Sequence, residues 1–170
     1  MGAPAEHALS LLQGFRPRGR CLGPLIAHWP QGIKRAGALC RDQTHIIDLM
    51  ATCVEVAGAR YPATFHGKKI LPLEGKSLVP SFSGGRVGHE ALFWEHNGKC
   101  AILEGDWKLV RLVGAPWELY DLKRDRTELN NLARQAPERV RALEAKWNVW
   151  AERTGVFPKP HKEQMRPAGK

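Results

Sequence analysis

The chain has 170 residues, of which 43% are hydrophobic and 25% charged, and its formal net charge is +9. These proportions are typical of a globular protein and exclude a fully disordered or collagen-like chain. Because no segment approaches the roughly 18 consecutive apolar residues of a membrane-spanning helix, we expect no membrane partner.

Most of the excess positive charge lies at the two ends of the chain. Residues 1–22 carry a net +2 and residues 153–170 a net +4, whereas residues 23–152 carry only +3. Interspersed charges of both signs are typical of an ordinary solvated surface. Because no long basic stripe and no nucleic-acid-binding motif is present, we expect no nucleic-acid partner, and nucleic-acid binding is the weakest of the alternatives.

A strand and a helix are the first elements that the pattern predicts. Residues 24–30, Pro-Leu-Ile-Ala-His-Trp-Pro, form an apolar run that is typical of a buried strand in a parallel sheet. Residues 45–58 place apolar side chains at helical spacing, and we expect Thr44 to cap this helix and Gly58 to end it. A strand followed by an amphipathic helix indicates α/β architecture.

Short strands dominate the next part of the chain, after a Gly-, Pro- and Lys-rich stretch. Residues 59–89 contain several chain breakers, which predict a long irregular connection. Asn97-Gly98 is the strongest signal for a two-residue hairpin turn, and apolar runs flank it. The sequence therefore predicts an antiparallel meander of four strands, over 91–96, 99–103, 107–113 and 117–122.

A final helix is predicted over about 136–153. Pro137 suits its first turn. One apolar stripe follows at spacings of three and four residues, formed by Val140, Leu143, Trp147 and Trp150. Such a stripe is typical of a helix that packs on a sheet, so we expect an α+β unit here. Residues 158–170 are predicted to be a loose basic tail.

Three histidines and a group of acidic residues are candidates for chemistry. His96 lies at the mouth of the predicted hairpin beside Asn97, where loops present side chains to ligands. His28 is expected to be packed in the buried strand, and His45 to make capping or loop contacts. The spacing of Asp121, Asp125 and Glu128 does not fit a calcium-binding EF-hand loop, so we expect turn and capping roles.

The four cysteines show no metal-binding or paired spacing. Neither a C-x-x-C pair nor a zinc-type Cys/His cluster is present. We therefore expect reduced, partly buried thiols at Cys21, Cys40, Cys53 and Cys100. No nucleophile elbow, phosphate-binding loop or H-E-x-x-H pattern is present either, so spacing alone indicates no self-sufficient active site.

Seven segments, in order, resemble consecutive blocks of bacterial arylsulfatases over about residues 23–157. The blocks are Gly-Pro-Leu-Ile-Ala-His-Trp-Pro (23–30), His-Ile-Ile-Asp-Leu-Met-Ala-Thr-Cys-Val-Glu-Val-Ala-Gly-Ala (45–59), Leu-Glu-Gly-Lys-Ser-Leu (73–78), Glu-Ala-Leu-Phe-Trp-Glu-His-Asn-Gly (90–98), Gly-Asp-Trp-Lys-Leu-Val (105–110), Trp-Glu-Leu-Tyr-Asp-Leu (117–122) and Asp-Arg-Thr-Glu-Leu-Asn-Asn-Leu (125–132). The resemblance implies an alkaline-phosphatase-like α/β fold. Residues 23–58 would be the last strand and helix of its catalytic domain, 59–89 a connection, and 90–157 the C-terminal subdomain.

The resemblance also implies which groups this chain lacks. Sulfatases use a formylglycine made within a C/S-x-P-x-R motif, together with a calcium ion held by acidic residues, and neither motif occurs in this sequence. We therefore assign no catalytic or metal residue, and expect formylglycine and calcium only in a complete enzyme. The C-terminal subdomain of related sulfatases overhangs the substrate pocket, which makes His96 and Asn97 hypothetical substrate contacts.

Two functional interpretations follow from the resemblance. The first is the C-terminal fragment of an arylsulfatase-like sulfuric ester hydrolase, inactive alone, whose sulfate ester substrate binds only the complete enzyme. The second is a non-enzymatic interaction module or complementing fragment. Residues 1–22 match no family block and show no clear secretory signal. Read one base later, suitable codons for 16–22 restore a family-like segment, so one interpretation of this leader is out-of-frame translation. The alternative is a divergent N-terminus on a genuine short protein. Compartment and oligomeric state are left open.

Overall fold

The computed structural model describes residues 25–35 and 37–156, so the predictions for the leader 1–22 and the tail 158–170 lie outside the described residues. The chain divides into two compact units. One is Leu25–Glu90, and the described part of the other is residues 91–156. Among the helices of the described residues, none is both long and apolar enough to cross a membrane.

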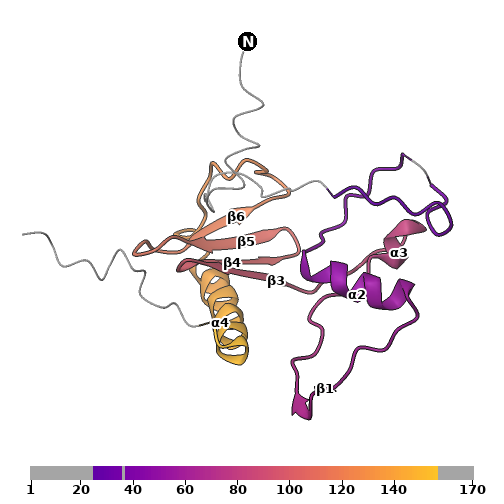
Figure 1. Ribbon diagram of the computed structural model, residues 1–170. Coiled ribbons are helices and arrows are strands. Elements are labelled where there is room, and N and C mark those ends of the chain that lie inside the picture. Colours follow the sequence, from indigo (N-terminus) through magenta and orange to yellow (C-terminus); the bar gives the residue numbers. More distant parts are fainter. Residues whose placement is uncertain (1–24, 36, 157–170) are drawn as a thin grey trace, which may run out of the picture. The chain divides into compact units, whose positions relative to one another are not determined.

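A four-stranded antiparallel sheet forms the body of the second unit (Figure 1). Its strands, in chain order and in sheet order, are β3 (Leu92–His96), β4 (Lys99–Glu104), β5 (Trp107–Arg111) and β6 (Glu118–Asp121). Asn97 and Gly98 join β3 to β4 with φ angles of 53° and 79°. This pair of left-handed residues matches the right-handed twist of the strands, so the predicted hairpin and meander are confirmed.

Helix α4 (Pro137–Thr154) lies across one face of this sheet (Figure 1). It begins with Pro137, whose missing N–H costs nothing in the first turn, and it ends at Gly155 in the left-handed conformation. The helix predicted over 136–153 is thereby confirmed to within one residue at each end.

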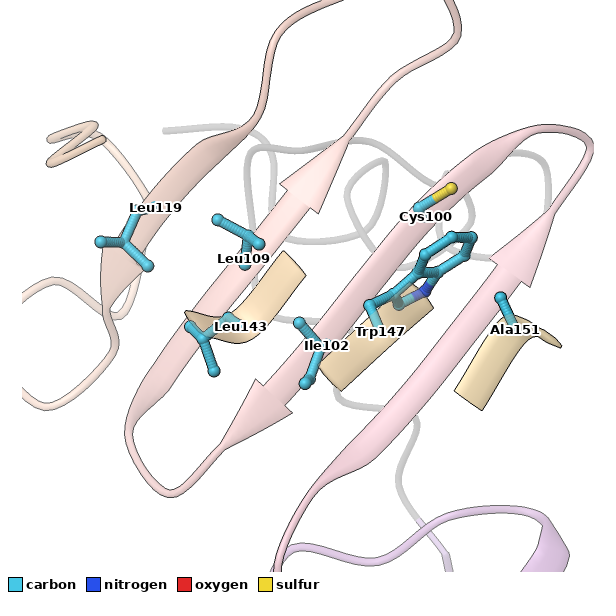
Figure 2. Packing of buried hydrophobic residues seen from close by; sticks show 7 residues of the cluster. All are labelled: Cys100, Ile102, Leu109, Leu119, Leu143, Trp147 and Ala151. Atoms are coloured by element: carbon cyan, nitrogen blue, oxygen red, sulfur yellow. The ribbon is translucent and has the colours of Figure 1, made fainter. Parts of the chain in front are cut away.

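The core of this unit lies between α4 and the sheet (Figure 2). Leu143, Trp147 and Ala151 point from the helix toward sheet residues, and all are at most 3% exposed. The facing side chains are those of Cys100, Ile102, Leu109 and Leu119, all with 0% exposure. Burial of each large aliphatic or aromatic side chain contributes about 1.5–3 kcal/mol to the stability of this unit.

The unit Leu25–Glu90 contains four short elements. They are helix α2 (Ile47–Val56), strands β1 (Thr64–Phe65) and β2 (Lys68–Lys69), which pair as a hairpin, and helix α3 (Val79–Phe82). The prediction of an irregular connection over 59–89 was therefore incomplete, because it missed β1, β2 and α3. The predicted Thr44 cap is also wrong, because the helix starts after Ile46 with no side-chain cap at that residue.

The predicted buried strand over 24–30 is wrong for the residues that the structure describes. Residues 25–29 adopt no strand, and Leu25 and Ile26 are 54% and 90% exposed. His28 is exposed as well. A strand requires a neighbour for its backbone hydrogen bonds, and nothing in the described chain pairs with this segment.

The apolar face of α2 remains uncovered. Ile46 and Met50 are 76% and 57% exposed, and Asp48 is the one residue of the helix that is buried. Leu78 and Val87 are the buried hydrophobic residues of this unit among those described. The unit therefore lacks a counterpart of the core beneath α4.

Hydrogen exchange is expected to differ strongly between the two units. Amides in the middle of β4 and β5 and of α4 should exchange slowly, because they open only when the α4 core opens. Amides of residues 25–58 should exchange far faster, since little apolar burial opposes their opening. Exchange followed by mass spectrometry on the full chain checks this, and equal protection throughout would contradict it.

Candidate functional site

The β3–β4 turn carries both site residues that the sequence predicted. His96 ends β3 and Asn97 begins the turn, and both side chains are exposed. Their side chains meet, with 3.1 Å between His96 Nε2 and Asn97 Nδ2. The sheet therefore brings the two residues together at one hairpin tip.

Charged neighbours flank this tip. Lys99 pairs with His96 across the two strands, which places an ammonium group on the same face as the imidazole. On the opposite face, the Glu95 carboxylate accepts a hydrogen bond from the Gly98 N–H at 2.7 Å, which holds the turn. The face with His96 and Lys99 can therefore offer donors to an anion.

The hairpin tip is suited to binding rather than to bond cleavage. The nearest thiol along the chain, Cys100, lies on the opposite face, buried in the α4 core. Burial raises the pKa of this thiol, which keeps it protonated and a poor nucleophile. In the described residues the tip thus has hydrogen-bonding groups without a nucleophile beside them.

A buried carboxylate organises the unit Leu25–Glu90. Asp48, in the first turn of α2, is fully buried and accepts hydrogen bonds from the backbone N–H groups of His45 at 2.7 Å and Lys76 at 2.9 Å. The ring nitrogen Nε2 of His89 lies 2.9 Å from the same carboxylate. Asp48 thus ties two distant parts of the chain, at Lys76 and His89, to the start of α2.

Gly75 allows this close approach. A Cβ atom built on Gly75 would stand 2.2 Å from the carbonyl oxygen of Ile47, a distance that no side chain tolerates. One turn further along the helix, the Thr52 hydroxyl donates to the Asp48 carbonyl at 2.6 Å and accepts from the Leu78 N–H at 2.9 Å. Segment 75–78 is therefore fastened to α2 by polar contacts.

His45 is half-buried beside this carboxylate. Burial lowers the pKa of His45, the charge of Asp48 acts in the opposite direction, and His89 adds to the lowering. A depressed folded-state pKa means that this unit loses stability as pH falls below the ordinary histidine value. The expected capping role of His45 is confirmed: its backbone N–H donates to the Asp48 carboxylate, and its ring nitrogen Nδ1 accepts a long hydrogen bond of 3.4 Å from the Ile47 N–H.

Asp121, the last residue of β6, and Asp125 serve turns as the sequence indicated, whereas the turn role expected for Glu128 is wrong because its carboxylate is buried against Lys108. Asp121 accepts from the Lys123 N–H at 3.0 Å, and Asp125 accepts from the Asn130 N–H at 2.7 Å. The backbone hydrogen bond from Asn130 is the main reason why the pKa of Asp125 is lowered. In residues 25–35 and 37–156, no three His, Cys, Asp or Glu side chains are grouped as a metal site.

Glu128 has a role that sequence analysis missed. Its carboxylate lies 2.6 Å from the Lys108 ammonium, and both side chains are buried. The two residues are 20 positions apart, so no local spacing signals the pair. Asp48 was missed for the same reason, although its position three residues after His45 resembles half of a capping box.

The predicted free state holds for all three thiols that the structure describes, and the predicted burial holds for one of them. Cys100 is buried, whereas Cys40 and Cys53 are exposed, and all three are free. Cys53 is exposed because the apolar face of α2, on which it lies, has no partner in the described part of this chain. Cys21 lies outside the described residues.

Comparison with known proteins gives a consistent match. The family profile "N-sulphoglucosamine sulphohydrolase, C-terminal" matches residues 20–148. An uncharacterized sulfatase of Schizosaccharomyces pombe is 30% identical over 158 residues, which cover 88% of this chain and 28% of that protein. Arylsulfatase K of Xenopus laevis is 31% identical over 115 residues, 59% of this chain and 21% of that protein.

Comparison with solved structures supports the fold. The crystal structure of Ps i-CgsB has a TM-score of 0.59 and 21% identity to this chain, over 73% of it and 27% of that protein. This chain spans about a fifth to a third of the length of the relatives it matches. Because the relatives include a yeast and a frog protein, they do not restrict the source to bacteria.

Replacement of Asp48 by alanine is expected to release segment 75–78 from α2. The substitution leaves the partly buried N–H groups of His45 and Lys76 without their acceptor, at a cost of about 1 kcal/mol. Proteolysis within residues 59–89 should accelerate while the α4 core stays intact. The control Glu55→Ala removes an exposed carboxylate from the same helix, and equal proteolysis of the two variants would contradict the assignment.

Proposed function

The chain belongs to the sulfatase family, of which it carries the C-terminal region, and we propose that it functions as one part of a sulfuric ester hydrolase that is inactive on its own. The proposed role is to complete a sulfatase whose remaining part supplies the nucleophile and the metal. Formylglycine and calcium would both reside in that remaining part, since this sequence lacks the motifs for either.

The observation that carries the proposal is the uncovered apolar face of α2. A helix with this many exposed apolar side chains is expected to have a partner, because contiguous exposed apolar surface marks interaction sites. Ile46, Ile47 and Met50 share this face, and Cys53 lies one turn further on. The occupant that fits best is the α/β sheet of the N-terminal part of a sulfatase.

Residues 25–30 support the same arrangement. Their sequence is apolar, yet they are largely exposed and pair with no strand in the described chain. In the proposed complex this segment adds to the partner's sheet as its last strand, followed by α2, as in an alkaline-phosphatase-like α/β fold. Unpaired backbone groups and exposed apolar side chains would then be satisfied together.

The names of two relatives suggest the class of substrate. An "N-acetylglucosamine-6-O-sulfatase" of Bacteroides thetaiotaomicron is 29% identical over 116 residues, and an "Ulvan-active sulfatase" of Formosa agariphila is 28% identical over 142 residues. We extend the proposal to sulfated sugars as the substrate of the completed enzyme, with His96 and Asn97 as contacts on the substrate side.

A second candidate function is a non-enzymatic interaction module. The packing of α4 on the sheet favours it, because residues 91–156 hold a closed core without help from the rest of a sulfatase. Such a module would bind a partner through the unit Leu25–Glu90 without contributing to catalysis.

Association can be measured with the Schizosaccharomyces pombe relative, truncated before the region that this chain matches. Co-expressed with this chain, the truncated protein should co-elute in size exclusion. The complex should hydrolyse 4-methylumbelliferyl sulfate in the presence of calcium, whereas neither part alone should do so. Ile46→Asp with Met50→Asp should abolish co-elution, because two carboxylates cannot be buried in an apolar interface.

The control for this experiment is Glu55→Gln, a change at an exposed polar position of the same helix, which should leave co-elution intact. Absence of any complex would contradict the proposed role. A complex that forms without turnover, even after formylglycine has been detected by mass spectrometry, would favour the interaction module.

His96 and Asn97 are tested in the same complex. His96→Ala should raise KM for sulfate esters several-fold with a smaller effect on kcat, because one exposed hydrogen bond to an anion contributes about 1 kcal/mol. Asn97→Gly removes the second side chain and keeps the turn, since glycine adopts the required positive φ. Unchanged kinetics relative to the distant exposed control Lys123→Ala would refute the substrate contact.

A further inference from the structure

The β1–β2 hairpin has a well-defined geometry although it is only two residues long on each side. Thr64 pairs with Lys69, and Phe65 pairs with Lys68. His66 and Gly67 form the turn with φ angles of 48° and 74°. The Ile70 N–H donates to the Ala63 carbonyl at 3.1 Å and extends the ladder. The positions of the side chains on the two faces are therefore fixed by the register.

All six residues of the hairpin, 64–69, are exposed. The ring of Phe65 is 63% exposed and meets the imidazole of His66 edge-on, with 4.2 Å between their centroids. A large aromatic side chain held in solvent on a paired backbone loses little further freedom when a ligand binds to it.

Charge distinguishes this hairpin from the apolar face of α2. Because partners in a two-stranded ladder share a face, Phe65 lies beside Lys68 on one face, and Lys69 lies beside Thr64 on the other. Neither face can enter an apolar interface without burial of an ammonium group, which is costly. The hairpin is therefore unsuited to the contact that α2 is proposed to make.

An anionic chain is the ligand that fits this pattern. Lys68 and Lys69 present one ammonium group on each face of the hairpin, and such groups attract a polyanion through charge-assisted hydrogen bonds. The exposed ring of Phe65 adds an apolar platform for the face of a sugar. Lys68 is the cross-strand partner of Phe65, so its ammonium group is available to a sulfate on a sugar that lies against the ring.

We propose that the β1–β2 hairpin is a binding site for a sulfated glycan chain, in which Phe65 lies against a sugar ring, Lys68 pairs with a sulfate on that face, and Lys69 pairs with a further sulfate from the opposite face. This inference rests on the proposed function, which supplies sulfated sugars as the substrate class. It adds a contact formed by residues of the unit Leu25–Glu90, whereas the β3–β4 turn belongs to the other unit. Such a contact would retain a long substrate between successive cleavages.

The test is direct binding to the full chain, with no partner and no turnover. Fluorescence polarisation with a fluorescein-labelled heparin hexasaccharide should give a Kd that weakens with salt. Lys68→Ala with Lys69→Ala should raise Kd about three- to tenfold. Phe65→Ala should raise Kd by a similar factor of about three to ten, without a change in the salt dependence.

The matched control is Lys123→Ala with Arg126→Ala, which removes two exposed positive charges from the loop after β6. Circular dichroism of each variant verifies that the fold is retained. An equal increase in Kd for the control double variant and the hairpin double variant would overturn the proposal. So would undiminished binding of the desulfated hexasaccharide, or tighter binding of a single-stranded oligonucleotide of equal charge. Failure of the complementation experiment leaves this binding readout unaffected, so the two proposals fail separately.

Discussion

The packing of the Trp147 side chain, from α4, against the sheet is the contact on which the second unit depends. The indole is 1% exposed, and its N–H donates to the carbonyl oxygen of Trp94 at 3.1 Å, so its apolar body and its polar group are both satisfied. Phe93 stacks on Trp150 at 5.2 Å beside it. Three of the four strands contribute fully buried side chains to this one layer, and the sheet and helix hold each other in place through it.

The other unit is organised by a different kind of interaction. Asp48 and Thr52 use oxygen atoms to fasten segment 75–78 to α2, while the apolar residues of the helix remain in solvent. Hydrogen bonds contribute modestly to stability because water competes for the same groups. A unit built in this way has a defined backbone path but little free energy of its own, which fits a surface that is completed by association.

Local signals in the sequence predicted the second unit well. Asn97-Gly98 specified the hairpin, and Pro137 bounded α4, because turn and cap preferences act within a few residues. The run 24–30 was misread because its apolar character is real but the described chain offers it no partner strand. Two contacts were missed because they join residues far apart in the sequence, which no local pattern reveals. The hydrogen bond between Asp48 and Lys76 spans 28 positions, and the ion pair between Lys108 and Glu128 spans 20. His96 and Asn97 lie at the hairpin tip where the sequence predicted them, and their contact with a substrate stays a prediction.

The distribution of indoles has a spectroscopic consequence. Five of the six tryptophans of the chain lie in residues 91–156, and the ring centroid of Trp147 is 6.0 Å from those of both Trp117 and Trp150. Neighbouring indoles at this separation exchange excitation energy, so near-ultraviolet dichroism and intrinsic emission report almost entirely on the α4 layer. A melting curve recorded by tryptophan fluorescence would therefore look like a single cooperative transition, even if the unit Leu25–Glu90 had unfolded at a lower temperature. Among the tryptophans, Trp29 alone would report the unfolding of that unit.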